Sequence, residues 1–308
     1  MKKYTLVLIF CLTGVNLNYS QTWTCGNPFT DSRDGNTYTT VQIGSQCWMA
    51  ENLAYLPSVS PLSASSGTIP YYYVYNYWIT SVSIAKTTSN YQTYGVLYNW
   101  PAAMDGELSS NSVPSGVQGI CPTGWHLPSD EEWKILEGEV DSQYGYPDPE
   151  WDGTDWRGTD AGGNLKETGT THWNLPNTGA TNSSGFLALP GGLGDHLNVQ
   201  FVNLGSSVGF WSSRESFNGA WTRMLFYESP NVSRNAILKN VGFSVRCLLG
   251  CHPQPTQSDA GPDQLDFQGT STILAANTPI NGQGLWTINS GYGGSFNDPN
   301  NPTTIFNG

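Results

Sequence analysis

Carboxylates and tryptophans gather in one stretch of the chain, residues 141–163. Four of its five aspartates alternate there with two tryptophans, without a helical or strand period: Asp148, Asp152, Asp155, Asp160, Trp151 and Trp156. Hard oxygen ligands suit Ca²⁺, and the tryptophan rings could stack on a sugar ring. These six residues are the candidate ligand-binding residues, with Ca²⁺ as a candidate cofactor. The alternative is a solvated acidic loop with its tryptophans tucked into the domain, because the regular spacing of a known Ca²⁺ loop is missing.

The other residue types of catalytic sites do not form a recognisable pattern. The histidines, His126, His172, His196 and His252, are widely scattered. There is no Ser/His/Asp order, no phosphate-binding glycine loop and no His-x-x-x-His pair. His126 has no second potential metal ligand at ligand spacing, which favours a structural role for it. We expect no catalytic residue and a protein that is not an enzyme.

The N-terminus has the order of a secretory signal peptide. Met1-Lys2-Lys3 precedes an apolar run over residues 4–15, and the polar stretch "NLNYS" follows. We predict a signal peptide over residues 1–20, cleaved near Ser20–Gln21, and a secreted or cell-surface protein. The apolar run is too short for a transmembrane helix, and no later stretch approaches the roughly 20 apolar residues that a span requires.

The charge balance is strongly acidic. The chain has 12 Lys and Arg against 24 Asp and Glu, a net charge of −12, which argues against binding to nucleic acid or to anionic membranes. Only 12% of the residues are charged, while Gly numbers 35 and Trp 12. This composition is typical of secreted β-rich binding proteins with many loops.

Five cysteines remain once the leader is removed: Cys25, Cys47, Cys121, Cys247 and Cys251. In an exported chain, disulfides are favoured over metal ligands. The number is odd, so one cysteine is free or has a partner outside this segment. The spacing alone leaves the connectivity open.

Two local patterns predict secondary structure. Residues 37–43 and 46–49 are β-type runs separated by Gly44-Ser45, which predicts a hairpin. In "GWHLPSDEEWKIL", Ser129 and Glu132 form a capping box, and apolar residues follow at helical spacing, so a helix begins there and extends to about Val140. The stretch is therefore a helix start and not a catalytic signature.

The rest of the chain up to residue 250 consists of loops and short β-type runs. Residues 57–91, which include "YYYVYNYW", read as an insertion whose aromatic cluster is either an exposed binding surface or a buried strand. Residues 141–163 read as a long loop, and "SGFLALPGG", "GFWSSRE", "AWTRMLFY" and "GFSVRCLL" as short strands. The fold class is α+β, with mostly antiparallel short strands and one or two helices.

The composition changes at Cys251. Residues 251–308 begin with the linker "CHPQPTQSDAGPDQ" and continue as β-runs with Gly-Asn turns and no helix signal. We predict a linker and a partial all-β module there, because fewer than 60 residues are too few for a self-sufficient sandwich. The domain before it spans residues 21–250.

Seven motifs between residues 25 and 249 carry a family resemblance. They are "DGNTYTTVQIGSQCWMAENLAY", "YGVLYNWPAA", "GICPTGWHLPSDEEWKIL", "GNLKETGTTHW", "NSSGFLALPGG", "GFWSSRE" and "GFSVRCL". The segment resembles the Fibrobacter succinogenes major paralogous domain, a family of exported bacterial domains. That family in turn resembles the C-type-lectin-like fold of the sulfatase-modifying-factor proteins. The resemblance implies a disulfide-tied scaffold that presents long loops.

The lectin-like fold also implies how the cysteines pair. A Cys121–Cys247 disulfide would close the domain as the long-range disulfide of such folds does, and a Cys25–Cys47 disulfide would tie the N-terminal strand to the hairpin. Residues 258–307, with "LWTINSGYGGSFNDPNNPTTIF", resemble the PKD-like immunoglobulin-type modules of Bacteroidota surface adhesins. This likeness implies display at the cell surface and a chain that is part of something longer.

Three functions follow from these patterns. The first is a secreted or cell-surface binding and adhesion protein whose ligand is a surface glycan or a protein. The second is a structural subunit of an extracellular filament or stalk, with self-association through residues 258–308. The third is a formylglycine-generating-type oxidase, because Cys247 and Cys251 lie close together near the end of the domain. The characteristic segments of those enzymes are absent here, and we favour the first function.

Overall fold

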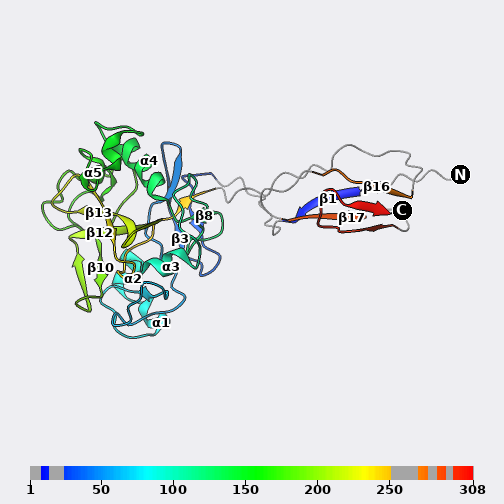
Figure 1. The fold of residues 1–308 in the computed structure, drawn as a ribbon. Helices are drawn as coiled ribbons and strands as arrows, with labels where there is room; N and C mark the ends of the chain where they lie inside the picture. Colours follow the sequence, from blue (N-terminus) through cyan, green and yellow to red (C-terminus); the bar gives the residue numbers. More distant parts are fainter. Residues whose placement is uncertain (1–7, 14–23, 251–269, 277–282, 289–293, 308) are drawn as a thin grey trace. The chain divides into compact units, whose positions relative to one another are not determined.

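The computed structural model describes residues 8–13, 24–250, 270–276, 283–288 and 294–307 (Figure 1). The chain forms two compact units. One unit spans Trp23–His252, and the other combines Met1–Thr22 with Pro253–Gly308.

The larger unit contains a six-stranded sheet with the strand order β11-β10-β12-β13-β14-β9. Neighbouring strands are antiparallel except for β10 and β12, which are parallel. The strands are β9 (Asp155–Arg157), β10 (Gly191–Asp195), β11 (Gln200–Leu204), β12 (Ser207–Ser216), β13 (Gly219–Phe226) and β14 (Val232–Ile237). Strands β12 and β13 overlap the predicted runs "GFWSSRE" and "AWTRMLFY", whereas β11 and β14 lie outside the predicted runs.

A four-stranded sheet brings together strands from the beginning and the end of this unit's sequence. It contains β4 (Thr40–Ile43), β5 (Gln46–Met49), β8 (Trp125–His126) and β15 (Leu248–Leu249), in the order β4-β5-β15-β8. The β4–β5 hairpin turns at Gly44-Ser45, with Ile43 opposite Gln46, so the predicted hairpin is confirmed. Two small ladders complete the unit: β2 (Phe29–Thr30) with β3 (Thr37–Tyr38), and β6 (Tyr72–Tyr73) with β7 (Leu97–Tyr98).

The predicted helix is α4 (Asp130–Val140), and its capping box is present. The expectation of one or two helices is nevertheless too low. The described residues also form α1 (Val82–Ala85), α2 (Ser89–Tyr94), α3 (Trp100–Met104), α5 (Ala161–Leu165) and the 3₁₀ helix η1 (Pro149–Asp152). These helices have four to six residues, too few for a 3.6-residue period to show in the sequence. None of the described helices has the length and apolar character that crossing a membrane requires.

Aromatic side chains dominate the core of the larger unit. Trp48, Trp133, Phe186 and Phe210 form one cluster, with ring centroids 4.9–6.1 Å apart. Arg246 lies in the same cluster, 4.3 Å from the centre of the Phe186 ring, and donates to backbone carbonyl oxygens. A buried arginine in the last motif, "GFSVRCL", therefore ties the end of the domain to its aromatic core.

The smaller unit is all β where it is described. It has a sheet in the order β16-β19-β18, made of β16 (Ser271–Ile273), β18 (Ser295–Phe296) and β19 (Ile305–Asn307). A separate pair joins β17 (Gln283–Ile288) to β1 (Leu8–Thr13) in six antiparallel registered positions. Strand β1 falls within the predicted signal peptide, whereas the predicted cleavage position and Cys251 lie outside the described residues.

Candidate functional site

The six residues proposed for ligand binding do not share one surface. The segment 141–163 is partly regular and contains η1, β9 and the start of α5, which corrects the expectation of a long loop. Trp151 is fully buried, and its indole N–H donates to the Gly145 carbonyl. Trp156 is half-exposed and packs against Phe226 at 5.1 Å between ring centroids. Trp151 therefore offers no ring face to a sugar, and Trp156 alone could.

The four candidate aspartates of this segment have separate local contacts. Asp148 caps η1, Asp160 accepts a hydrogen bond from a backbone N–H, and Asp155 belongs to β9. Asp152 pairs with Lys134, 2.6 Å from its ammonium nitrogen. Within the described part of the chain, no group of three or more His, Cys, Asp or Glu could hold a metal ion. The structure thus gathers no Ca²⁺ ligand set from these aspartates.

A buried ionic network connects this segment to α4 and the large sheet. Glu137 accepts from Arg157 at 2.7 Å and from Arg223, and Asp130 accepts from Arg223 and Arg234 at 2.6 Å each. All five side chains are buried. Burial alone would raise the pKa of Asp130, but Arg223 and Arg234 hold it well below its ordinary value. The Asp130 carboxylate therefore stays ionised at neutral pH, and the network ties α4 to β9, β13 and β14.

The "WHLPSDEE" stretch is a second buried network. Ser129 Oγ accepts from the Glu132 N–H at 3.1 Å, and Glu132 Oε2 accepts from the Ser129 N–H at 2.8 Å. The other oxygen of Glu132 lies 2.8 Å from Nε2 of the buried His126. A Cβ on Gly250 would come within 1.8 Å of the His126 ring, so this pair also requires a glycine at the end of the domain. His126 has the structural role that the sequence favours.

Both predicted disulfides are present. Cys25 is bonded to Cys47, and Cys121 is bonded to Cys247. The second disulfide joins residues 126 positions apart in the sequence and links the segment before α4 to the last strand region. Cys247 is therefore not a free thiol.

The aromatic stretch at residues 71–78 is divided between the core and the surface. Tyr73 and Tyr77 are buried, whereas Trp78 is half-exposed and packs against Phe201 at 5.2 Å between ring centroids. Tyr75 also packs against Phe201, at the same distance between ring centroids. The stretch therefore lies partly in the core, as expected for a buried strand, and partly on the surface.

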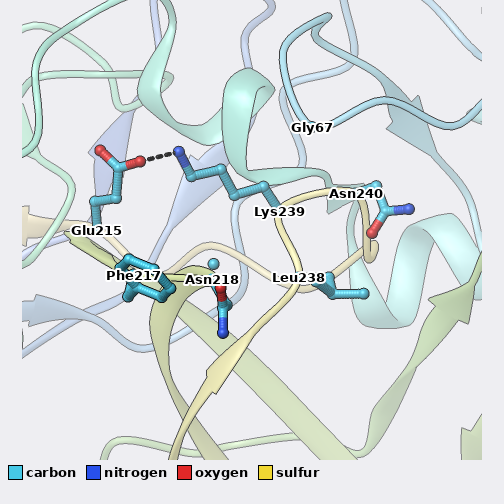
Figure 2. Close-up of a pocket in the computed structure, with 8 residues that line it drawn as sticks. Gly67, Glu215, Phe217, Asn218, Leu238, Lys239 and Asn240 are labelled. Atoms are coloured by element: carbon cyan, nitrogen blue, oxygen red, sulfur yellow. Dashed lines mark hydrogen bonds and ion pairs between the residues drawn. The ribbon is translucent and has the colours of Figure 1, made fainter.

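A pocket of about 360 Å³ opens beside the turn between β12 and β13 (Figure 2). Three chain segments line it: Gly67 from the first, Glu215 and Phe217 to Gly219 from the second, and Leu238 to Asn240 from the third. We call these residues the hairpin pocket. In Figure 2 the Lys239 side chain reaches across toward Glu215, and Phe217, Asn218 and Leu238 lie together on the other side of it.

The hairpin turn presents the aromatic ring of Phe217 to solvent. Strand β12 ends at Ser216, opposite Gly219 at the start of β13, so Phe217 and Asn218 form a two-residue turn. Phe217 is fully exposed. A Cβ on Gly219 would come 2.0 Å from the Ile237 carbonyl oxygen, so a glycine is needed where the turn approaches the next strand. The fold therefore leaves this apolar ring in water, in a pocket that also contains the half-exposed Leu238.

Polar groups of both signs form the opposite wall of the pocket. The Lys239 ammonium pairs with Glu215 and lies 4.5 Å from the centre of the Trp100 ring. The backbone N–H of Trp100 donates to the Lys239 carbonyl oxygen at 2.9 Å. The Asn240 carboxamide donates to Ser65 Oγ at 2.9 Å. These contacts fix the wall to α3 and to the loop before β6. The wall can donate and accept hydrogen bonds without movement of the backbone.

The hairpin pocket is lined by apolar and amide side chains and one ion pair. Its lining residues include no histidine, cysteine or serine, and its single carboxylate is already paired with a cation. Sequence reasoning missed the pocket because residues 67, 215, 217–219 and 238–240 are distant in the chain. One signal was available: Asn218-Gly219 marks a hairpin turn between two β-runs, and Phe217 beside it is an apolar residue at a turn.

The comparisons with known proteins agree with the motifs read from the sequence. Residues 41–248 match the family model described as the Fibrobacter succinogenes major domain. The matched segment contains nearly all of the β4–β5 hairpin, α4, the six-stranded sheet and every residue of the hairpin pocket. Neither a curated protein nor a solved structure matches the chain. Because the match covers more than half of its length, the chain belongs to the Fibrobacter succinogenes major domain family.

Proposed function

We propose that this chain is an exported, non-enzymatic binding and adhesion protein that contacts a surface glycan or protein through the hairpin pocket. The observation that carries the proposal is the fully exposed ring of Phe217 beside that pocket. The two disulfides support export, because such bonds form and persist in oxidising compartments. The lectin-like scaffold implied by the family resemblance would suit this role, since it holds binding loops on a rigid framework.

The binding test uses the full chain with its disulfides formed. Wild type and Phe217→Ala are applied to glycan arrays and to extracellular protein arrays, each with and without a chelator. We expect ligands that wild type binds and the variant binds more weakly, with no effect of the chelator. If the chain binds nothing of either class more strongly than a non-specific control does, the binding function is wrong.

Export is tested separately from binding. The chain is expressed with its leader, and the N-terminus of the product recovered outside the cytoplasm is sequenced. We expect a new N-terminus near Gln21. Retention of the leader on the extracellular product would contradict the predicted signal peptide.

A second candidate function is a filament or stalk subunit, and one contact favours it. Strand β17 pairs along its whole length with β1, from the predicted signal peptide. The backbone N–H of Trp286 donates to the Pro299 carbonyl oxygen, on the side away from β1. The backbone N–H groups of its neighbours Leu285 and Thr287 therefore point toward β1. Cleavage of the leader would leave this edge of β17 open to a strand from a second copy.

The filament function is tested by sedimentation of the mature chain beside a version that ends at Gly250. Assembly would make the longer chain sediment faster, and Thr287→Pro, which removes one ladder N–H, would reverse the change. A Thr287→Val variant, which keeps the N–H, serves as the control. Equal, monomeric behaviour of both chains would rule out self-association through residues 258–308.

An oxidase of the formylglycine-generating type is the least supported function. Such an enzyme would use a reactive cysteine pair near the end of the domain. Cys247 is already bonded to Cys121, and the bond lies in the buried core. A structural role of Cys247 supports the non-enzymatic proposal.

A further inference from the structure

We infer that the hairpin pocket takes one ring of a neutral pyranose oligosaccharide, with the C–H face of that ring on Phe217. This inference rests on the proposed binding function and names its ligand class. The pocket volume of about 360 Å³ is at the small end of the range for ligand pockets, roughly 300–1,000 Å³. A site of this size accommodates one small unit of a longer ligand.

The lining combines one exposed apolar ring with groups that donate and accept hydrogen bonds. The Asn218 carboxamide has no hydrogen-bond partner among the described residues, so its oxygen and its NH₂ are both available to a ligand. Glu215 supplies acceptor oxygens, and Lys239 supplies donors. A pyranose matches this set, because its ring has an apolar face and its hydroxyl groups both donate and accept.

The charges near the pocket argue against an anionic ligand. Lys239 is the only cation of the lining, and Glu215 neutralises it. Six of the ten Lys and Arg side chains in the described part of the chain are buried: Lys134, Arg157, Lys166, Arg223, Arg234 and Arg246. Few cations therefore remain on a protein of net charge −12 to attract a phosphate, a sulfate or a uronic acid. A neutral ligand avoids this repulsion.

The geometry of the turn favours a sugar over a peptide strand. Phe217 lies at the tip of a hairpin whose strands β12 and β13 are already paired with each other and with neighbouring strands. On the other side of β12, the backbone of Ser213 bonds Pro128 and Ser110, and the Glu215 N–H donates to Ser109 Oγ, so loop residues occupy the edge that a peptide strand would need. A stacked ring needs only the exposed face of Phe217.

The experiment is an isothermal titration calorimetry measurement, in which the full chain is titrated with each of three oligosaccharides. The probes are cellohexaose, mannohexaose and an acidic hexagalacturonate. We expect saturable binding of at least one neutral hexasaccharide and little binding of the acidic one. Addition of EDTA leaves the affinity unchanged, because the lining supplies no metal ligand set.

Three variants connect the binding to the pocket. We expect Phe217→Ala to lower the affinity at least about tenfold and Asn218→Ala to lower it several-fold, while Phe217→Trp keeps it. Leu175→Ala removes another exposed apolar side chain, 77% exposed, and serves as the matched control. Each variant is first checked by its thermal unfolding midpoint, so that a loss of fold is not mistaken for a loss of contact.

The outcomes separate this inference from the proposed function. If the arrays find a protein ligand that depends on Phe217 but neither neutral hexasaccharide binds, the binding function stands and the sugar inference is wrong. The inference is also wrong if Phe217→Ala binds sugar like wild type, if the acidic probe binds best, or if EDTA abolishes binding. Absence of any ligand in the arrays removes the proposed function itself.

Discussion

The buried network around Asp130 gives the sharpest test of what stabilises the larger unit. Its carboxylate lies 2.6 Å from Nη1 of Arg223 and 2.6 Å from Nη2 of Arg234, and all three side chains are buried. Asp130→Asn keeps the shape of the side chain but removes the negative charge that compensates two buried guanidinium groups. Removal of one partner from a buried ion pair costs about 3–5 kcal/mol. We therefore expect the variant to lose about 3 kcal/mol or more of its free energy of unfolding.

The matched control is the same substitution at Asp152, which also contacts α4. Its carboxylate is 2.6 Å from the Lys134 ammonium, but its side chain is 73% exposed. Solvent screens such a pair, and its loss costs about 0–1 kcal/mol. Two carboxylates with similar distances to their cations should therefore differ several-fold in the effect of the same substitution.

The assay is urea unfolding followed by tryptophan fluorescence, with the disulfides intact. For an m-value of about 1–3 kcal/mol/M, a loss of 3 kcal/mol lowers the midpoint by about 1 M or more. Asp152→Asn should shift the midpoint by a small fraction of this amount. If the two variants unfold within about 0.5 kcal/mol of each other, burial does not set the strength of these pairs and the reasoning fails.

Three further predictions use the same unfolding assay. The pKa of Asp130 is lowered in the folded state. Its contribution to the free energy of unfolding is therefore full above its unfolded pKa of about 3.9 and is lost as the pH falls toward the folded pKa. The stability difference between wild type and Asp130→Asn should shrink below about pH 4, and a constant difference down to pH 2 would contradict this. Ser129→Ala removes a side-chain cap and should cost about 1 kcal/mol without loss of ligand binding; full stability with lost binding would make the helix-start interpretation wrong. Replacing Cys121 and Cys247 with serine should cost about 5 kcal/mol, against about 3 for the shorter-range disulfide, by chain-entropy estimates; equal losses would argue against that account.

Features set by local sequence could be predicted, and they were. The β4–β5 hairpin needs only two β-runs and Gly44-Ser45, and α4 needs only a capping box followed by an apolar face. Both signals lie within about a dozen residues. The cysteine pairing came from the resemblance, since spacing alone left it open.

Features that depend on tertiary contacts could not be predicted in this way. Helices α1, α2 and α3 are each too short to show a period, and their signals are single capping residues, Ser81, Thr88 and Asn99. Strand β9 is recruited into the large sheet by β14, about 80 residues later in the chain. The sequence around Trp151 does not distinguish it from Trp156. The packing of η1 buries Trp151, whereas Trp156 remains half-exposed.

The contacts of the 141–163 segment have a physical cause in the same network. The sequence shows the acidic residues of the 141–163 region but not that Arg157, Arg223 and Arg234 are buried beside it. These three arginines hold two carboxylates of α4, and Lys134 of α4 takes up Asp152. Charges that look available for a ligand in the sequence thus anchor the segment to the domain. The exposed ring of Phe217, with the neutral polar side chains of Asn218 and Asn240 in the same pocket, is the candidate that we favour for contact with another molecule.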